Sequence, residues 1–266
     1  VPHNYSIILV LLVCASACLA FGDVITDGLM VRNGKTLDLV GAFQSIQWAA
    51  LGGALTLSHL AGGYLAQNAS PRTAFLLCTV FPLFVLLATV NFYKQGQHSH
   101  QPPRRHLLSR DLKAFLRSRR IWTVAGFLFL WNFSPIFGTP LLFYQRDVLE
   151  FSKLFIGVLG SIANAAGMVG AVAFFFLFRD WEQSRLLRLA ISFGVLSTLS
   201  FIGLAGNTSA TLIFLSYGFL SQITHLSVLL LAARACPPGL EATVFALLMS
   251  VLNLGRSTSF GLGGWL

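Results

Sequence analysis

Long uninterrupted runs of apolar residues, separated by short polar connections, dominate this chain. Apolar residues follow one another continuously within each run instead of alternating with polar ones, which favours helices over membrane-spanning strands. A helix needs about 20 residues to cross roughly 30 Å of hydrocarbon. Eight runs reach about that length: Tyr5–Val31, Leu39–Ala66, Thr73–Phe92, Ile121–Tyr144, Leu154–Phe178, Leu186–Leu204, Leu212–Ala233 and Ala242–Leu266.

Composition leads to the same class of protein. The chain has 266 residues, of which 55% are hydrophobic and only 10% are charged, and its mean hydropathy is +0.74. Soluble domains carry about 25% charged residues, so a soluble fold of this composition would expose large apolar patches. We therefore expect an all-α, multi-pass integral membrane protein of a cell or inner membrane, or of an organelle envelope if the source bears plastids.

One connection differs from the others, because residues 93–120 are polar and strongly basic and contain Pro102-Pro103. We interpret this segment as a linker between the end of an N-terminal helical half (1–92, three spans) and a C-terminal half (121–266, five spans, truncated). Two equal halves of six spans would then lack three spans before this chain and one after it. Because the chain also starts with Val1 and not Met, we interpret it as a fragment. Two halves around a midplane site are typical of transporters.

The positions of Lys and Arg predict the orientation, because these residues gather on the cytoplasmic side of membrane proteins. With the basic linker in the cytoplasm, fourteen basic residues fall on that side and three on the other. The cytoplasmic set is Arg32, Lys35, Lys94, Arg104, Arg105, Arg110, Lys113, Arg117, Arg119, Arg120, Arg179, Arg185, Arg188 and Arg234, and the opposite set is Arg72, Arg146 and Lys153. The net charge of +9 is then explained by orientation and by contact with anionic lipid headgroups, not by nucleic-acid binding.

Two carboxylates, Asp23 and Asp27, belong to the first apolar run. An ionisable group in a membrane span costs roughly 3 kcal/mol, so it is a functional hypothesis by default. Their i,i+4 spacing places both on one helix face, which we expect to look into a protein cavity. Neighbouring carboxylates in such a site can exchange protons, which suggests coupling or gating. The alternative is a structural pair that binds a basic residue such as Arg32.

Arg256 is the basic residue that lies well inside a predicted span. Arginine stays charged in a protein, so it requires an anion or hydrogen-bond acceptors. Met249, Asn253, Arg256 and Phe260 follow at steps of 4, 3 and 4 and share one face. A guanidinium, an amide and an aromatic ring together suit a planar substrate that bears a carboxylate. The alternative is a buried ion pair with an acid.

Further polar residues in the spans are candidate substrate-binding residues. Tyr217 and His225 share a face of the seventh run, although a lone membrane histidine often serves only to bond two helices. Pro135 and Pro140 predict that the fourth run is bent or broken, a feature common beside transporter cavities. The complete set of predicted substrate-binding residues is Gln47, Trp48, Asn132, Tyr217, Gln222, His225, Asn253 and Arg256.

Three segments carry a family resemblance. Arg234–Gly255, which reads RACPPGLEATVFALLMSVLNLG, resembles the signature of the folate–biopterin transporters, a branch of the major facilitator superfamily. Asp23-Val-Ile-Thr-Asp27-Gly28 resembles the acidic motif in the fourth helix of that family. Gln47-Trp48, with the glycine pairs that follow it, is similar to the fifth helix. The resemblance covers nearly the whole chain.

The resemblance implies a partial major facilitator fold, with eight of twelve transmembrane helices, roughly helices four to eleven. It implies a secondary active transporter that moves folate, pterin or related solutes by alternating access, with protons as the coupling ion. Some relatives carry other solutes, including S-adenosylmethionine, which is the alternative cargo. The matching motifs point to Asp23, Asp27, Arg234 and Glu241 for proton coupling or gating. Arg234 and Glu241 flank a Pro-Pro-Gly turn and are placed to form a salt bridge.

Other function classes fit less well. An intramembrane aspartyl protease needs acids from two helices, whereas Asp23 and Asp27 share one. A channel usually shows a repeated filter or a polar pore stripe, and a scaffold has little reason to keep Arg256 in a span. Cys14 and Cys18 have no histidine or second thiol pair nearby, so we expect no metal site and no cofactor. The predicted partners are a small-molecule substrate, protons and the lipid bilayer.

Overall fold

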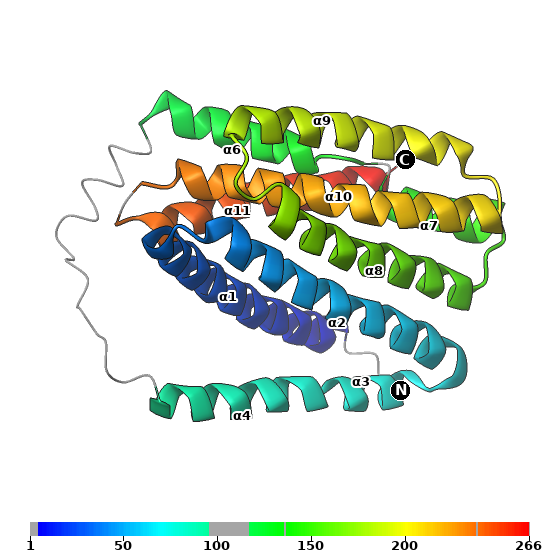
Figure 1. Cartoon of the computed structure of the whole chain (residues 1–266). Coiled ribbons are helices and arrows are strands. Elements are labelled where there is room, and N and C mark those ends of the chain that lie inside the picture. The colour runs from blue at the N-terminus through cyan, green and yellow to red at the C-terminus, as the bar shows by residue number, and fades with distance from the viewer. Residues whose placement is uncertain (1–4, 96–116, 136, 238, 266) are drawn as a thin grey trace.

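The computed structural model describes residues 5–95, 117–135, 137–237 and 239–265, and the regular structure within them is helical (Figure 1). The helices before the basic linker are α1 (Tyr5–Leu37), α2 (Val40–Asn68), α3 (Pro71–Cys78) and α4 (Val80–Gln95). Those after it are α6 (Arg119–Asn132), α7 (Thr139–Phe143), the π-helix η1 (Tyr144–Val148), α8 (Lys153–Leu177), α9 (Gln183–Ser200), the short 3-10 helix η2 (Phe201–Gly203), α10 (Asn207–Ala235) and α11 (Glu241–Gly263).

Five helical segments of the described part are long and apolar enough to cross a membrane, judged by length and composition. They are Ile7–Leu37, Arg72–Asn91, Lys153–Leu177, Gln183–Gly203 and Asn207–Ala235. This finding supports the predicted all-α membrane protein with several spans. The count of eight spans and the major facilitator fold stay predictions.

The fourth predicted span, Ile121–Tyr144, is a broken helix. Helix α6 ends at Asn132, and regular helix resumes only at Thr139, with Pro140 in the first turn of α7. A proline has no N–H to donate and its ring clashes with the preceding turn, so Pro135 and Pro140 prevent a continuous helix here. The sequence left open whether this span bends or breaks, and the structure shows a break.

The third predicted span, Thr73–Phe92, is also interrupted, which the sequence analysis missed. Helix α3 ends at Cys78 and α4 begins at Val80, with Thr79 between them. Pro82 has no N–H to donate to the carbonyl of Cys78, so the helical ladder is incomplete at this point.

The connections between helices gather at two opposite ends of the molecule (Figure 1). The α1–α2, α8–α9 and α10–α11 connections lie at one end, which we call the basic end because it carries Arg32, Lys35, Arg179, Arg185 and Arg234. The α2–α3, η1–α8 and α9–α10 connections lie at the other. Residues 96–116 of the predicted linker 93–120 lie outside the described residues, and the division into two halves stays a prediction.

The buried core lies around the carboxyl-terminal part of α10. Leu226, Val228 and Ala232 are completely buried and belong to a cluster with residues of α6, α8, α9 and α11. Residues 7–26 of α1 are instead exposed, as are most residues of α4. In a bilayer, such apolar exposed faces meet lipid or other transmembrane segments.

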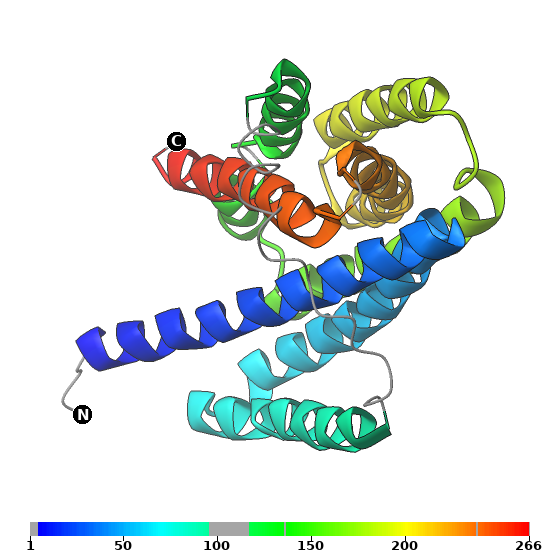
Figure 2. The ribbon, with the colours of Figure 1, turned by 90° about the vertical axis from the view of Figure 1, so that its left-hand side faces the viewer.

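Two helix pairs determine where the interior is open. Helix α2 packs extensively against α8, whereas α1 reaches α11 only near the basic end, where Gly28 faces Ala242. Figure 2 shows the amino-terminal part of α1 diverging from the rest of the bundle. The space between these helices contains the site described below.

Candidate functional site

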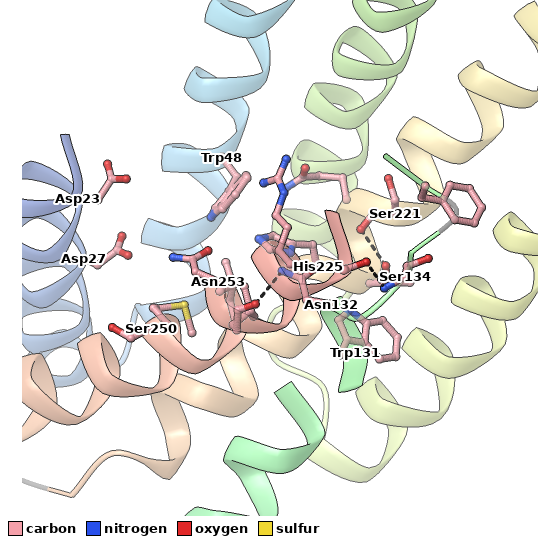
Figure 3. Close-up of a pocket in the computed structure, with 18 of the residues that line it drawn as sticks. Asp23, Asp27, Trp48, Trp131, Asn132, Ser134, Ser221, His225, Ser250 and Asn253 are labelled. Carbon is pink, nitrogen blue, oxygen red and sulfur yellow. Dashed lines mark hydrogen bonds between the residues drawn. The ribbon is translucent and has the colours of Figure 1, made fainter. Parts of the chain in front are cut away.

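A polar cavity of about 760 Å³ lies between α1 and α2 on one side and α6 and α8–α11 on the other (Figure 3). Its lining combines carboxylates, a guanidinium, amides, hydroxyls and aromatic rings, all contributed by helices that are otherwise apolar. Charged groups are expensive in hydrocarbon, so a shared polar cavity explains why this membrane protein retains them.

Asp23 and Asp27 both line the cavity and project from α1 towards Ser250 and Asn253 of α11 (Figure 3). Their spacing on one helix face explains this common direction. Asp27 is half-buried and accepts a hydrogen bond of 2.9 Å from Nε2 of Gln47 on α2. Asp23 is exposed to the cavity. Neither acid forms an ion pair with another described residue, so the alternative pairing with Arg32 is absent from this arrangement.

Arg256 lines the cavity from α11, together with Met249, Asn253 and Phe260. Its guanidinium carbon lies 5.3 Å from the centroid of the Phe260 ring, a cation–π contact. The setting of α11 depends on Gly255, where a β-carbon would come within 2.4 Å of a main-chain oxygen of α6. This close approach orients the face that carries Arg256.

Helices α2 and α10 meet in the cavity wall through Trp48 and His225. Their ring centroids are 4.3 Å apart, in an edge-to-face arrangement. Tyr217 and Gln222 line the cavity from the same helix as His225. The Nε2 atoms of Gln222 and His225 are buried and have no hydrogen-bond partner among the described residues.

The broken helix contributes a polar edge to the cavity. Asn132, the last residue of α6, donates from Nδ2 to the carbonyl of Leu252 on α11 at 3.2 Å. The backbone N–H of Ser134 donates to Oγ of Ser259, also on α11, at 2.8 Å. Ser134 and Ser259 were not among the predicted site residues, because single hydroxyls are common in membrane helices. The prolines beside Ser134 were the signal that could have indicated it.

Arg234 and Glu241 do not line the cavity; they lie at the basic end. An Nη1 atom of Arg234 donates to the carbonyl of Trp181 and to Oε1 of Gln183, both at 3.2 Å. The described part of the chain contains no Arg234–Glu241 ion pair. The gating role suggested for these two residues therefore stays a prediction.

Asp147, outside the predicted spans, shows how a paired acid differs from the cavity acids. Both of its carboxylate oxygens accept hydrogen bonds from Arg146, at 2.6 and 2.9 Å. This guanidinium holds the pKa of the Asp147 carboxyl below its ordinary value. The acid of this exposed pair is occupied by its neighbour, whereas Asp23 faces the cavity.

The structure brings together seven of the eight predicted substrate-binding residues. Those that line the cavity are Trp48, Asn132, Tyr217, Gln222, His225, Asn253 and Arg256. Gln47 does not line the cavity and is connected to it through its hydrogen bond to Asp27. The site thus offers hydrogen-bond acceptors on α1, a cation on α11 and flat aromatic surfaces between them.

Helices of membrane length around a charged internal cavity define a multi-pass integral membrane protein with a polar interior site. The chain belongs to the BT1 family, whose model matches residues 2–266. The family resemblance expected from the sequence is thereby confirmed.

Three relatives with curated names match most of this chain. It is 30% identical over 271 residues to "Folate-biopterin transporter" of Synechocystis sp., covering 96% of this chain and 54% of that protein. It is 26% identical to "Probable folate-biopterin transporter 7" of Arabidopsis thaliana (91% and 59% covered) and 26% identical to "Folate transporter 2" of Plasmodium falciparum (92% and 56%). The chain therefore spans about half the length of these relatives. No solved structure matches it.

Proposed function

We propose that the full-length protein moves folate, pterin or related solutes across the membrane by alternating access, with protons as the coupling ion. The observation that carries this proposal is the charged cavity: Asp23 and Asp27 face it from α1 and Arg256 faces it from α11. A scaffold or a simple packing core would not require such groups to line a common space within apolar helices, and the relatives are named as transporters and not as enzymes. The protein is accordingly proposed to be a carrier and not an enzyme.

Two features support a folate-like or pterin-like cargo. The cavity volume of about 760 Å³ lies within the range of roughly 300–1,000 Å³ that is usual for small-molecule sites. Trp48 and Tyr217 offer faces on which a heteroaromatic ring can stack, and Arg256 offers a bidentate partner for a carboxylate. The relatives whose printed names refer to folate or biopterin transport agree with this chemistry.

The acid pair also supports a second candidate. Asp23 and Asp27 form an anionic wall of the cavity, which suits a cationic cargo such as S-adenosylmethionine. In that case the acids would bind the cargo itself and not only a proton. The two candidates differ in which cavity charge is essential for binding: Arg256 for a carboxylate, or Asp23 for a cation.

We further propose different roles for the two acids. Asp27 is held by Gln47, so it has a defined position beside the cavity. Asp23 is exposed to the cavity and is the acid that a proton or a cargo donor reaches first. Gln222 and His225, whose buried Nε2 atoms have no protein partner here, are proposed to find theirs in another state of the transport cycle.

The test is uptake by the full-length protein in proteoliposomes. Labelled folate is competed with unlabelled folates, pterins and S-adenosylmethionine, with and without an imposed proton gradient. We expect saturable uptake, counterflow exchange and competition by pterins. Asp23→Asn should abolish gradient-driven uptake while leaving membrane insertion intact. Uptake that does not saturate would point to a channel, and gradient-driven uptake unaffected by Asp23→Asn would contradict the coupling role.

A further inference from the structure

Helices α1 and α11 approach each other closely at Gly28, next to the cavity acids. Gly28 directly follows Asp27 and is buried against α11. A β-carbon at Gly28 would lie 2.9 Å from the β-carbon of Ala242, closer than two side chains can normally approach. Any residue larger than glycine would therefore hold the two helices apart at this end of the cavity.

A charged hydrogen bond lies beside this contact. The Nζ of Lys35, in the last turn of α1, donates to the main-chain carbonyl of Cys236, the residue that follows α10. The carboxyl-terminal end of a helix carries partial negative charge and free carbonyl groups, so it favours a nearby cation. The bond connects the end of α1 to the turn that leads into α11.

Apolar packing completes the closure. Val31 is completely buried, in the same cluster as Cys236, Leu240 and Val244 at the α10–α11 turn. Towards its amino terminus, by contrast, residues 7–26 of α1 are all exposed (Figure 2). Helix α1 thus closes the space beside α11 at the basic end and leaves it open at the opposite end.

We propose that this contact is the closed gate at the basic end of the cavity. Gly28 and Ala242 form its packing surface, and Lys35 is the latch that holds it through the carbonyl of Cys236. The inference rests on the alternating access proposed above. It assigns the latch to Lys35, because Arg234 is engaged by Trp181 and Gln183 of the α8–α9 connection and so does not bridge to α1.

The accessibility of the cavity tests the latch. In the full-length protein with its native cysteines replaced, Ser250→Cys on the cavity wall serves as the reporter. A membrane-impermeant maleimide is added from the basic-end side of oriented vesicles. The background change Cys236→Ala keeps the latch, because the acceptor is a main-chain oxygen.

We expect Lys35→Met to increase the labelling rate of Ser250→Cys about tenfold, as expected for loss of one partly exposed charge-assisted hydrogen bond. Arg32→Met is the matched control, because it removes the same charge from an exposed position three residues earlier in α1. An unchanged rate in Lys35→Met, or an equal increase in Arg32→Met, would overturn the assignment.

Cross-linking tests the packing surface independently. In Gly28→Cys combined with Ala242→Cys, a separation of the helices by roughly 1 Å gives the distance of about 3.5–4.5 Å between β-carbons that a disulfide needs, and oxidation should stop counterflow until a reductant is added. Gly22→Cys with Ala242→Cys is the control, because a β-carbon at Gly22 would have no neighbour within 4 Å. No cross-link in the Gly28 pair, or counterflow that continues in the cross-linked protein, would contradict the gate.

These readouts separate the gate from the cargo. Labelling and the formation of the cross-link need no substrate, so a latch effect on labelling without folate uptake would support the gate and contradict the proposed cargo. Folate uptake without any latch effect on labelling would support the carrier and contradict the gate.

Discussion

The α2–α8 pair and the α1–α11 pair flank the same cavity but meet in different ways. Helix α2 stays close to α8 along its length: Gly41 lies against Arg179, two residues beyond the end of α8, and at the opposite end a β-carbon at Gly63 would lie 3.7 Å from the Cα of Gly157. Helices α1 and α11 have their close contact at Gly28 and Ala242, and α1 then diverges (Figure 2).

The difference lies in where glycines face another backbone. In lipid, helices associate through close packing and hydrogen bonds, because the tails are as apolar as the side chains. Gly52 and Gly157 let α2 and α8 approach closely at two separate heights, whereas Gly22 of α1 has nothing within reach of an added β-carbon. The α2–α8 pair is therefore suited to act as a fixed contact, which we call the seam. The α1–α11 pair is suited to act as a contact that opens during transport.

The largest effect is expected from a bulky residue within the fixed seam. A β-carbon at Gly157 would lie 3.2 Å from the carbonyl oxygen of His59 and 3.3 Å from the Cα of Gly63. Gly157→Leu should therefore force α2 from α8 and destabilise the fold by about 3 kcal/mol. The yield of monodisperse protein and its thermal midpoint in detergent measure this loss. Gly62→Leu on α2 is the control, because a β-carbon there meets nothing within 4 Å. Equal losses in both variants would contradict the distinction.

A bulky residue at the opening contact should impair transport more than folding. Gly28→Leu should keep α1 away from Ala242 and reduce uptake about tenfold, which corresponds to roughly 1.4 kcal/mol. Because residues 7–26 of α1 are exposed and its buried residues lie near the basic end, we expect the thermal midpoint to fall by only a few degrees, which corresponds to about 1 kcal/mol. Gly22→Leu should preserve uptake. A Gly28→Leu protein that fails to fold would show that this contact is structural.

A smaller effect is expected where α1 is joined to α2. Gln47→Leu removes the donor to Asp27, so a half-buried carboxylate loses its charge-assisted partner, at a cost of about 1–2 kcal/mol. The dependence of uptake on pH should change, because Gln47 contacts Asp27, one of the two acids proposed for proton coupling. Gln47→Glu, of similar size, tests whether the amide donor is what matters. A profile that both variants leave unchanged would contradict the positioning role of Gln47.

The smallest effect is expected at a shared hydroxyl in the seam. Oγ of Ser161 donates across the seam to the carbonyl of Thr56 at 3.1 Å and within α8 to Gly157 at 3.0 Å. Ser161→Ala should cost about 0.6 kcal/mol, the average for interhelical hydrogen bonds in membranes. Ser216→Ala, which loses only bonds within its own helix, is the reference in the same unfolding assay. If Ser161→Ala loses no more stability than Ser216→Ala, backbone packing alone holds α2 against α8.

Relations within one helix could be predicted from the sequence. Asp23 with Asp27, and Asn253 with Arg256, line the cavity together because a helix of 3.6 residues per turn fixes which residues share a face. That the span around Pro135 is bent or broken followed from the same local reasoning, since proline cannot complete the hydrogen-bond ladder. The interruption at Thr79, which was not predicted, has the same cause, because Pro82 also has no N–H to donate.

Relations between helices could not be predicted. Gln47, predicted to bind substrate, bonds Asp27 in this structure, and Arg234, predicted to pair with Glu241, contacts the α8–α9 connection; the predicted roles of both residues stay predictions. Several ways of packing the helices agree with the sequence, and each would give these side chains different polar partners. The choice among them depends on which helices pack together and at what height, information that residue spacing does not contain.

The sequence alone determined that this is a helical membrane protein of the BT1 family, and which residues face together on each helix. Hydropathy, proline chemistry and helical periodicity are local properties, so they can be read along the chain. Only the tertiary structure decided that α2 lies along α8, that α1 meets α11 at one end, and that Lys35 reaches the carbonyl of Cys236. These relations arise because glycine faces from distant segments must match in three dimensions, and lipid provides no hydrophobic force that would select the partners beforehand.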